Sequence, residues 1–281
     1  MKLLKGNAVA SQLAVQCKDF IALHGVSPLL KIIRVGENPH DLAYERGILK
    51  RFYDCGARVE VEELKGTVTQ TQFENAVLLA NEREDVDGIL IFRPLPKHID
   101  QDKIKNLIKA EKDVDCMGYA ASGRLYEGVS KASAPCTARA VMEILDFYKI
   151  DLSGKNITVV GRSAVIGKPV AMLLISKNAT VTVCHTKTLD LKEKCRAADI
   201  LIACAGKAKM IDISYVNPDQ VVIDVGINLE GDKIVGDVNF EEVEDKVAAL
   251  TPVPGGVGAV TTAVLLKQTL KNLALKKGLE F

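Results

Sequence analysis

The residues best placed for chemistry form a glycine-containing turn with an arginine inside it. Residues 157–169 have the sequence ITVVGRSAVIGKP: an apolar β-branched run, a glycine turn, and then proline in the first turn of a helix. At such a helix start, free backbone N–H groups and the positive end of the helix dipole bind phosphate. The residues expected to form this phosphate-binding turn are Gly161, Arg162, Ser163 and Gly167.

The charge at the end of the next strand indicates which nucleotide the turn binds. NAD is usually recognised there by an acidic residue that accepts the ribose 2′-hydroxyl. Here the strand is followed by His185, Thr186, Lys187 and Thr188, with no carboxylate, and Arg162 lies one strand away. These groups would donate charge-assisted hydrogen bonds to a 2′-phosphate, so NADP is favoured over NAD. The alternatives are a surface arginine in a turn and an ordinary loop histidine.

Two later loops are also suited to binding a ligand. Residues 251–258, TPVPGGVG, combine prolines that fix the backbone with glycines that allow close approach, just before the last predicted helix. Residues 224–228, DVGIN, follow a strand, and ligands bind at the carboxyl edge of such sheets. Without a ligand, residues 251–258 would simply lead into the helix, and residues 224–228 would be an ordinary turn, in which Gly, Asn and Asp are common. The residues expected to line a site are Ile227, Pro254, Gly255 and Gly256.

Composition limits the classes of partner and the compartment. The 281 residues carry a net charge of +1, from 37 basic and 36 acidic side chains, so neither a nucleic acid nor a membrane is indicated as a partner. The seven cysteines form no C-x-x-C pair, which favours free thiols in a reducing compartment. No apolar stretch of about 20 residues is present. We predict a cytoplasmic protein without a metal site.

Helical and strand patterns alternate along the whole chain, which predicts an α/β fold with parallel sheets covered by helices. Residues 118–134 are poor in large apolar groups and are expected to be a boundary loop between two domains. Helices are expected near 7–23, 39–54, 69–83, 101–109, 137–149 and 259–276. Strands are expected at 29–35, 58–64, 88–92, 156–160, 180–184, 200–203 and 221–225.

Several further segments carry a family resemblance. The sequence GENP at 36–39 precedes a predicted helix that bears Tyr44, residues 87–100 read DGILIFRPLPKHID, and KDVD and PCT follow at 112–115 and 135–137. With the two glycine-containing loops, these segments resemble the methylenetetrahydrofolate dehydrogenase/cyclohydrolase family, known in bacteria as FolD. The resemblance covers essentially the whole chain in the correct order.

The resemblance implies two domains with a folate site in the cleft between them. A three-layer α/β domain would comprise residues 1–134 and 260–281 and bind folate, and a Rossmann-like domain of residues 135–259 would bind NADP. Tyr44 would stack on the folate, and Asp115 would hydrogen-bond the amino-pyrimidine end of the pterin. Thr137 would lie on the cofactor side, and residues 254–258 would shape the site where the nicotinamide meets the one-carbon bridge. A homodimer through the second domain is also implied.

The sequence departs from that family at the residues of the hydrolytic step. Members with both activities carry a lysine four residues after the tyrosine and a glutamine at the end of the neighbouring strand. Here these positions are Ile48 and Phe92. Asp41 replaces a usual serine, and Lys50 is expected to point away from the tyrosine face of the helix. Without the family, Tyr44 would be a core aromatic, and Asp115 part of a solvated charge cluster.

The departures predict a dehydrogenase of one-carbon metabolism with little or no cyclohydrolase activity. Hydride transfer from the methylene bridge moves no proton, whereas opening the methenyl ring with water needs proton transfers that isoleucine and phenylalanine cannot perform. Three alternatives stay open: a bifunctional enzyme that uses Asp41 or an ordered water, a non-catalytic folate- or nucleotide-binding regulator, and a dehydrogenase for another metabolite.

Overall fold

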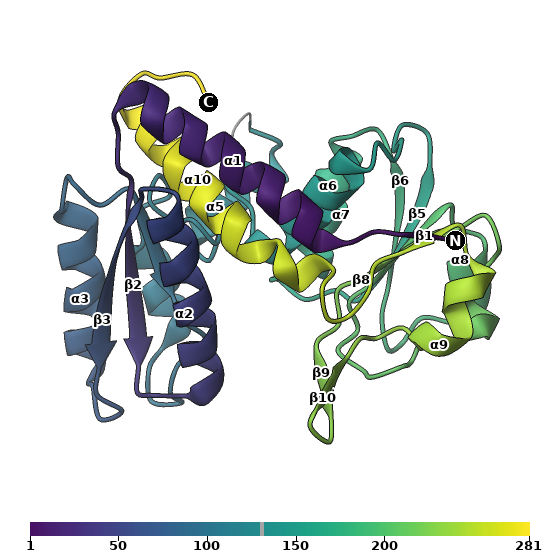
Figure 1. Cartoon of the computed structure of the whole chain (residues 1–281). Coiled ribbons are helices and arrows are strands. Elements are labelled where there is room, and N and C mark those ends of the chain that lie inside the picture. The colour runs from purple at the N-terminus through teal and green to yellow at the C-terminus, as the bar shows by residue number, and fades with distance from the viewer. Residues whose placement is uncertain (130–131) are drawn as a thin grey trace. The chain divides into compact units, whose positions relative to one another are not determined.

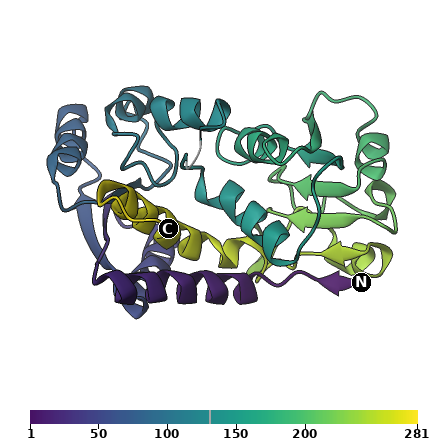
Figure 2. The same cartoon turned by 90° about the horizontal axis from the view of Figure 1, so that it is seen from above.

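A computed structural model describes residues 1–129 and 132–281, which divide into two compact units. The six-stranded unit comprises Met1–Ala10 and Pro135–Thr261, and the three-stranded unit comprises Ser11–Ala134 and Thr262–Phe281. The boundaries therefore fall inside the first helix, α1 (Gly6–His24), and at the start of the last helix, α10 (Thr261–Lys276). Figures 1 and 2 show the elements in two views.

Residues 1–10, which the sequence predicts in the first domain, group by their contacts with the six-stranded unit. These residues cluster with the six-stranded unit because their backbone pairs with the far end of the chain. Strand β1 (Lys2–Leu3) lies parallel to β11 (Ala249–Leu250). The Gly6 amide then donates to the Gly255 carbonyl at 2.8 Å.

The three-stranded unit is built on a parallel sheet of order β3-β2-β4. Figure 1 shows α2 and α3 on opposite sides of β2 and β3. Apolar side chains of β2, α3 and β4 form one core, with Ile33, Phe73 and Ile89 completely buried. The elements are β2 (Leu29–Val35), α2 (Pro39–Asp54), β3 (Arg58–Leu64), α3 (Gln70–Glu82), β4 (Gly88–Ile91), α4 (Gln101–Leu107) and α5 (Tyr119–Tyr126).

The helix α5 corrects the expectation that residues 118–134 form only a boundary loop. Its sequence, YAASGRLY, buries just two apolar side chains, Ala121 and Leu125. These residues are four apart and therefore share one helix face. A helix with so narrow an apolar face gives little periodic signal, and its glycine, alanine and serine content is typical of a loop.

The six-stranded unit contains a wholly parallel sheet of order β1-β11-β8-β7-β5-β6. A two-stranded antiparallel hairpin, β9-β10, which the sequence did not predict, follows β8. The remaining elements are α6 (Cys136–Phe147), β5 (Asn156–Val160), α7 (Gly167–Ile175), β6 (Thr180–Cys184), α8 (Leu191–Arg196), β7 (Ile200–Ala203), β8 (Val221–Asp224), β9 (Asn228–Glu230), β10 (Lys233–Val235) and α9 (Phe240–Val243).

Parallel pairing brings the carboxyl ends of the strands in each sheet to one edge, which is where α/β proteins bind ligands. In the six-stranded unit this edge carries the segments after β5, β6, β7 and β8. In the three-stranded unit it carries the segment after β4. Among the described residues, no helix is both long and apolar enough to cross a membrane, and no cluster of metal-ligating side chains is found.

Candidate functional site

The turn after β5 requires glycine at two positions. Gly161 has a φ of 139°, which side-chain-bearing residues rarely adopt, and a Cβ there would lie 2.3 Å from the Cys204 carbonyl oxygen at the end of β7. A Cβ on Gly167, the first residue of α7, would lie 2.1 Å from the Gly161 carbonyl oxygen. Neither glycine has room for a side chain, so the backbone is uncovered at the first and the last residue of the turn. This is the geometry that lets a phosphate approach a helix N-terminus.

The two polar side chains of this turn have different positions. The Ser163 hydroxyl accepts a hydrogen bond from the Ile166 amide at 3.1 Å, and the Ser163 carbonyl accepts from the Lys168 amide at 3.0 Å, so Ser163 holds the turn in shape. Arg162 is exposed and forms no ion pair with any described residue. Its guanidinium is therefore available to an anionic ligand.

The segment after β6 presents hydroxyl and imidazole groups without an acid. The His185 amide donates to the Thr188 hydroxyl at 2.8 Å, and the Lys187 amide donates to His185 Nδ1 at 3.1 Å. Because Nδ1 accepts, the neutral imidazole carries its proton on Nε2. Thr186 is exposed at the tip of this turn. The basic and hydroxyl groups here, with no carboxylate, are compatible with the 2′-phosphate of NADP.

Two buried carboxylates organise the loops after β7 and β8. The Asp224 carboxylate accepts from the backbone amides of Gly226, Asp237 and Val238 at 2.9–3.0 Å. Burial raises the pKa of Asp224 to about 6 despite these bonds. The Asp237 carboxylate in turn accepts from the Gly206 amide at 2.9 Å. The sequence predicts that Asp224 belongs to a loop suited to binding a ligand, with turn chemistry as the alternative. The mutual position of Asp224 and Asp237 was not predictable because 13 residues and a hairpin separate them.

A cavity of about 390 Å³ in the six-stranded unit brings together the residues expected to line a site. Gly255 adopts a φ of 97°, and a Cβ on Gly6 would lie 2.0 Å from the Gly256 carbonyl oxygen, so the loop packs directly on the backbone of α1. Asn7 also lines the cavity, a contribution that the sequence did not suggest. Thr137, in the first turn of α6, is half-buried and is not part of the lining. The lining includes Asn7, Asp224–Ile227, Ile234 and Pro252–Ala259.

In the three-stranded unit, the face of α2 next to β4 is aromatic and apolar. The Tyr44 ring, 36% exposed, lies with its centroid 5.7 Å from that of Phe92 and an angle of 38° between the rings. Phe92 is 7% exposed, and Ile48, one helical turn after Tyr44, is completely buried. Neither Ile48 nor Phe92 has a side chain that can donate or accept a proton.

Charged residues fix the helix that carries Tyr44. Arg34, 6% exposed on β2, bonds Glu45 of α2 at 2.7 Å and Glu63 of β3 at 2.9 Å. Lys50, in contrast, is 78% exposed and pairs with Asp54 at 2.8 Å, away from the buried face as expected. Lys50 therefore lies away from the face of α2 that carries Tyr44 and Ile48.

The segment that follows α4 positions Asp115. Asp113 is 1% exposed and accepts from the amides of Met117 at 3.0 Å and Gly118 at 2.7 Å, so the charge-cluster alternative fails for this residue. Asp115 is only partly exposed and forms an ion pair with Arg93, Nη2 to Oδ2, at 2.6 Å. Sequence reasoning did not assign Arg93 a role. Its place directly after the buried strand β4 was the available signal.

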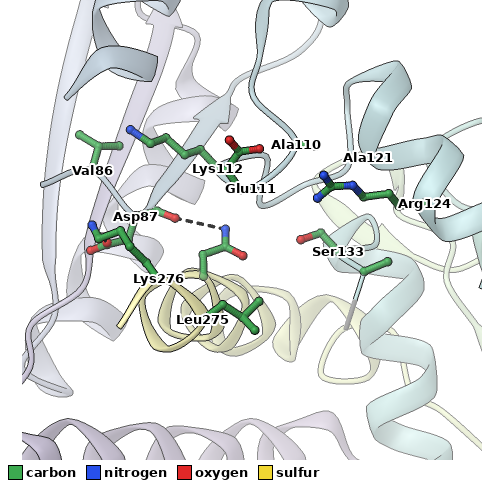
Figure 3. Close-up of a pocket in the computed structure, with 12 residues that line it drawn as sticks. Val86, Asp87, Ala110, Glu111, Lys112, Ala121, Arg124, Ser133, Leu275 and Lys276 are labelled. Carbon is green, nitrogen blue, oxygen red and sulfur yellow. Dashed lines mark hydrogen bonds and ion pairs between the residues drawn. The ribbon is translucent and has the colours of Figure 1, made fainter. Parts of the chain in front are cut away.

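A second cavity, of about 360 Å³, lies at the opposite end of β4. Val86 and Asp87, which line it, precede the strand, whereas Phe92 follows it. Figure 3 shows Asp87 and Lys276 beside each other at one end of this cavity and Arg124 at the other. The Asp87–Lys276 ion pair, at 2.7 Å, ties α10 to the start of β4, so these groups stabilise the unit.

Comparisons with known proteins cover both units. Residues 4–115 match the family model described as "Tetrahydrofolate dehydrogenase/cyclohydrolase, catalytic domain", and residues 135–277 match "Tetrahydrofolate dehydrogenase/cyclohydrolase, NAD(P)-binding domain". The bifunctional protein FolD of Clostridioides difficile is 46% identical over 279 residues, which are 98% of this chain and 97% of that protein.

Two solved structures are similar along the whole chain. The bifunctional enzyme FolD from Campylobacter jejuni superposes with a TM-score of 0.95 at 39% identity, over 98% of this chain and 99% of that one. FolD from Trypanosoma brucei, determined with NADP cofactor and an inhibitor, has a TM-score of 0.93 at 36% identity, over 98% of each chain.

Proposed function

The chain belongs to the tetrahydrofolate dehydrogenase/cyclohydrolase family, and on that premise we propose that it is an NADP-dependent methylenetetrahydrofolate dehydrogenase whose cyclohydrolase activity is weak or absent. The observation that carries the second half of the proposal is the apolar pair Ile48 and Phe92. Both side chains are buried, and the family resemblance implies a lysine and a glutamine at these positions in bifunctional members.

The six-stranded unit supplies the cofactor site. The turn that begins at Gly161 and ends at Gly167 holds the pyrophosphate, and Arg162 pairs with the 2′-phosphate, with Thr186 and His185 beside it. Ile227 and the backbone of Pro254–Gly256 line the pocket for the rest of the cofactor, and Thr137 contributes from α6. When bound, NADP accepts a hydride from the methylene carbon of the substrate, which becomes the methenyl cation.

The three-stranded unit supplies the folate site. Tyr44 stacks on the folate, and the Asp115 carboxylate accepts hydrogen bonds from the amino-pyrimidine end of the pterin. Oxidation of the methylene bridge releases no proton, so these residues bind and orient the substrate without acting as acids or bases. An apolar wall at Ile48 and Phe92 is compatible with this step.

Hydrolysis of the methenyl product has a different chemical requirement, because water must lose protons as the ring opens. A positioned acid–base group contributes about 10²–10⁴-fold to such a step. Ile48 and Phe92 offer none. The alternative that favours a bifunctional enzyme places the proton transfers on Asp41, which is half-buried in the first turn of α2.

The proposal is tested by measuring both activities of the purified protein. We expect NADPH to form with methylenetetrahydrofolate, and methenyltetrahydrofolate to be hydrolysed near its rate in buffer. If hydrolysis is fast, Asp41→Ala distinguishes the alternatives: loss of hydrolysis with the dehydrogenase intact assigns the proton transfers to Asp41. Failure of NADPH formation would contradict the dehydrogenase assignment and favour a binding protein.

We also propose that the enzyme is a homodimer in the cytoplasm. The seven cysteines are free thiols, which supports a reducing compartment. Light scattering that gives the mass of one chain would contradict the dimer.

A further inference from the structure

Arg93 stands next to Phe92, at the point where the chain leaves the buried strand β4. Its charge is permanent, because the guanidinium does not deprotonate in proteins. The site therefore combines the loss of a titratable cation at position 48 with a cation that cannot titrate at position 93. This cation cannot serve the proton transfers of hydrolysis, which leaves binding and positioning as the roles open to it.

The position of Arg93 is fixed by Asp115. Nη2 lies 2.6 Å from Asp115 Oδ2, and the two side chains are only 24% and 20% exposed. Such charge-assisted bonds are short and directional. Among the described residues, this is the one hydrogen bond that Arg93 makes, although the guanidinium carries five N–H donors. The pair therefore places a hydrogen-bond acceptor, the Asp115 carboxylate, next to hydrogen-bond donors, the N–H groups of the Arg93 guanidinium that do not bond Asp115.

The pterin of a folate carries the complementary pattern on one edge. Its 2-amino group and N3–H are donors, and its 4-oxo group, on the next ring atom, is an acceptor. A carboxylate that accepts from the 2-amino side leaves the 4-oxo group facing the residue beside the carboxylate. In this chain that residue is Arg93.

We propose that Arg93 is a specificity-determining residue that donates a hydrogen bond to the 4-oxo group of the pterin while it holds the Asp115 carboxylate in place. This inference rests on the proposed folate site, and it adds that the site selects 2-amino-4-oxo pteridines against 2,4-diamino analogues. In a 2,4-diamino analogue, the N–H groups of the 4-amino substituent would face the N–H groups of the Arg93 guanidinium. The guanidinium would then have no acceptor on the ligand.

The pair itself combines one positive and one negative group and carries no net charge. The Arg93 charge is balanced by Asp115, so the guanidinium does not oppose the positive charge that develops on the methenyl product. The effect of Arg93 is therefore expected in substrate binding and not in the rate of the bound complex.

The test compares two competitive inhibitors of NADPH formation, tetrahydrofolate and its 4-amino analogue, on the wild-type protein, Arg93→Met and Arg93→Lys. The wild type should bind tetrahydrofolate more tightly than the analogue. In Arg93→Met, the preference should fall about tenfold or more, and the KM for methylenetetrahydrofolate should rise by a similar factor while kcat stays within about twofold. Arg93→Lys keeps a donor and should retain part of the preference.

Three outcomes would overturn the inference. One is a wild type that binds the 4-amino analogue as tightly as tetrahydrofolate, which requires no variant. Another is an unchanged preference in a folded Arg93→Met protein, and the third is a loss confined to kcat. A wild type that forms NADPH while failing these criteria refutes only the role of Arg93. A wild type that neither forms NADPH nor binds tetrahydrofolate refutes the proposed function as well.

Discussion

Replacement of Arg162 by methionine should convert the enzyme from an NADP-selective form to one that uses both cofactors poorly and with little preference. Methionine keeps the apolar length of the side chain but removes its charge. Arg162 is exposed and makes no ion pair with the described residues, so its loss should leave the fold unchanged. The change isolates the contact with the 2′-phosphate.

The magnitude follows from the kind of bond lost. Hydrogen bonds to charged groups contribute about 1.5–3 kcal/mol, and each 1.4 kcal/mol corresponds to a factor of ten in binding. The KM for NADP should therefore rise about 10- to 150-fold, while the KM for NAD, which lacks the phosphate, should change little. Because the contact is exposed, the increase should become smaller at high ionic strength.

The assay is NADPH or NADH formation at saturating methylenetetrahydrofolate, over a range of cofactor concentrations. Lys168→Met is the matched control, because Lys168 is an exposed cation in the first turn of α7, the helix start at which both cofactors are expected to bind their pyrophosphate. Lys168→Met should weaken the binding of NADP and of NAD by similar factors. Equal losses for both cofactors in Arg162→Met would refute the assignment of Arg162 to the 2′-phosphate.

Three further changes test other parts of the structure. Gly161→Ala should lower the thermal unfolding temperature and abolish NADP binding, because its Cβ would meet the Cys204 carbonyl oxygen at 2.3 Å; normal binding would show that the turn can relax. The folded pKa of Asp224, about 6, exceeds its ordinary value of 3.8, so this group binds more protons in the folded state and its contribution to stability should increase by about 2 kcal/mol as the pH falls from 7 to 4. That component should be absent in Asp224→Asn, and identical pH profiles of unfolding free energy would contradict it. Ile48→Lys alone should destabilise the protein by about 3 kcal/mol by burying an unpaired ammonium, and Phe92→Gln in addition should recover stability and raise hydrolysis above the wild-type rate; a double variant as inactive as the wild type would show that other groups are missing.

Much of the fold follows from the sequence because several strands are apolar runs with clear boundaries. Leu29–Val35 and Asn156–Val160, for example, are largely buried strands rich in aliphatic side chains, and the observed strands have the predicted limits. Elements whose stability comes from distant partners were not predictable. The strand β1 has only two residues, and it forms because Lys2 pairs with Ala249, which lies near the other end of the chain.

In the candidate site, too, the local features were predictable from the sequence and the contacts between distant residues were not. The glycines of the phosphate-binding turn were predictable, because a strand, a turn and a helix start occur together over 13 residues. The pairing of Arg93 with Asp115 was not, since 22 residues separate them and only the folded loops bring them to 2.6 Å. The burial of Ile48 and Phe92 agrees with their apolar character, but the contact between the Tyr44 and Phe92 rings required the structure.

The most direct test of the account is a side-by-side measurement of both reactions on one preparation of the wild-type protein, with NADP and with NAD. The account predicts NADPH formation from methylenetetrahydrofolate, a lower kcat/KM with NAD, and hydrolysis of methenyltetrahydrofolate no faster than in buffer alone. Hydrolysis well above the buffer rate would contradict the central claim that the apolar pair at positions 48 and 92 has removed the hydrolytic half of the family's chemistry.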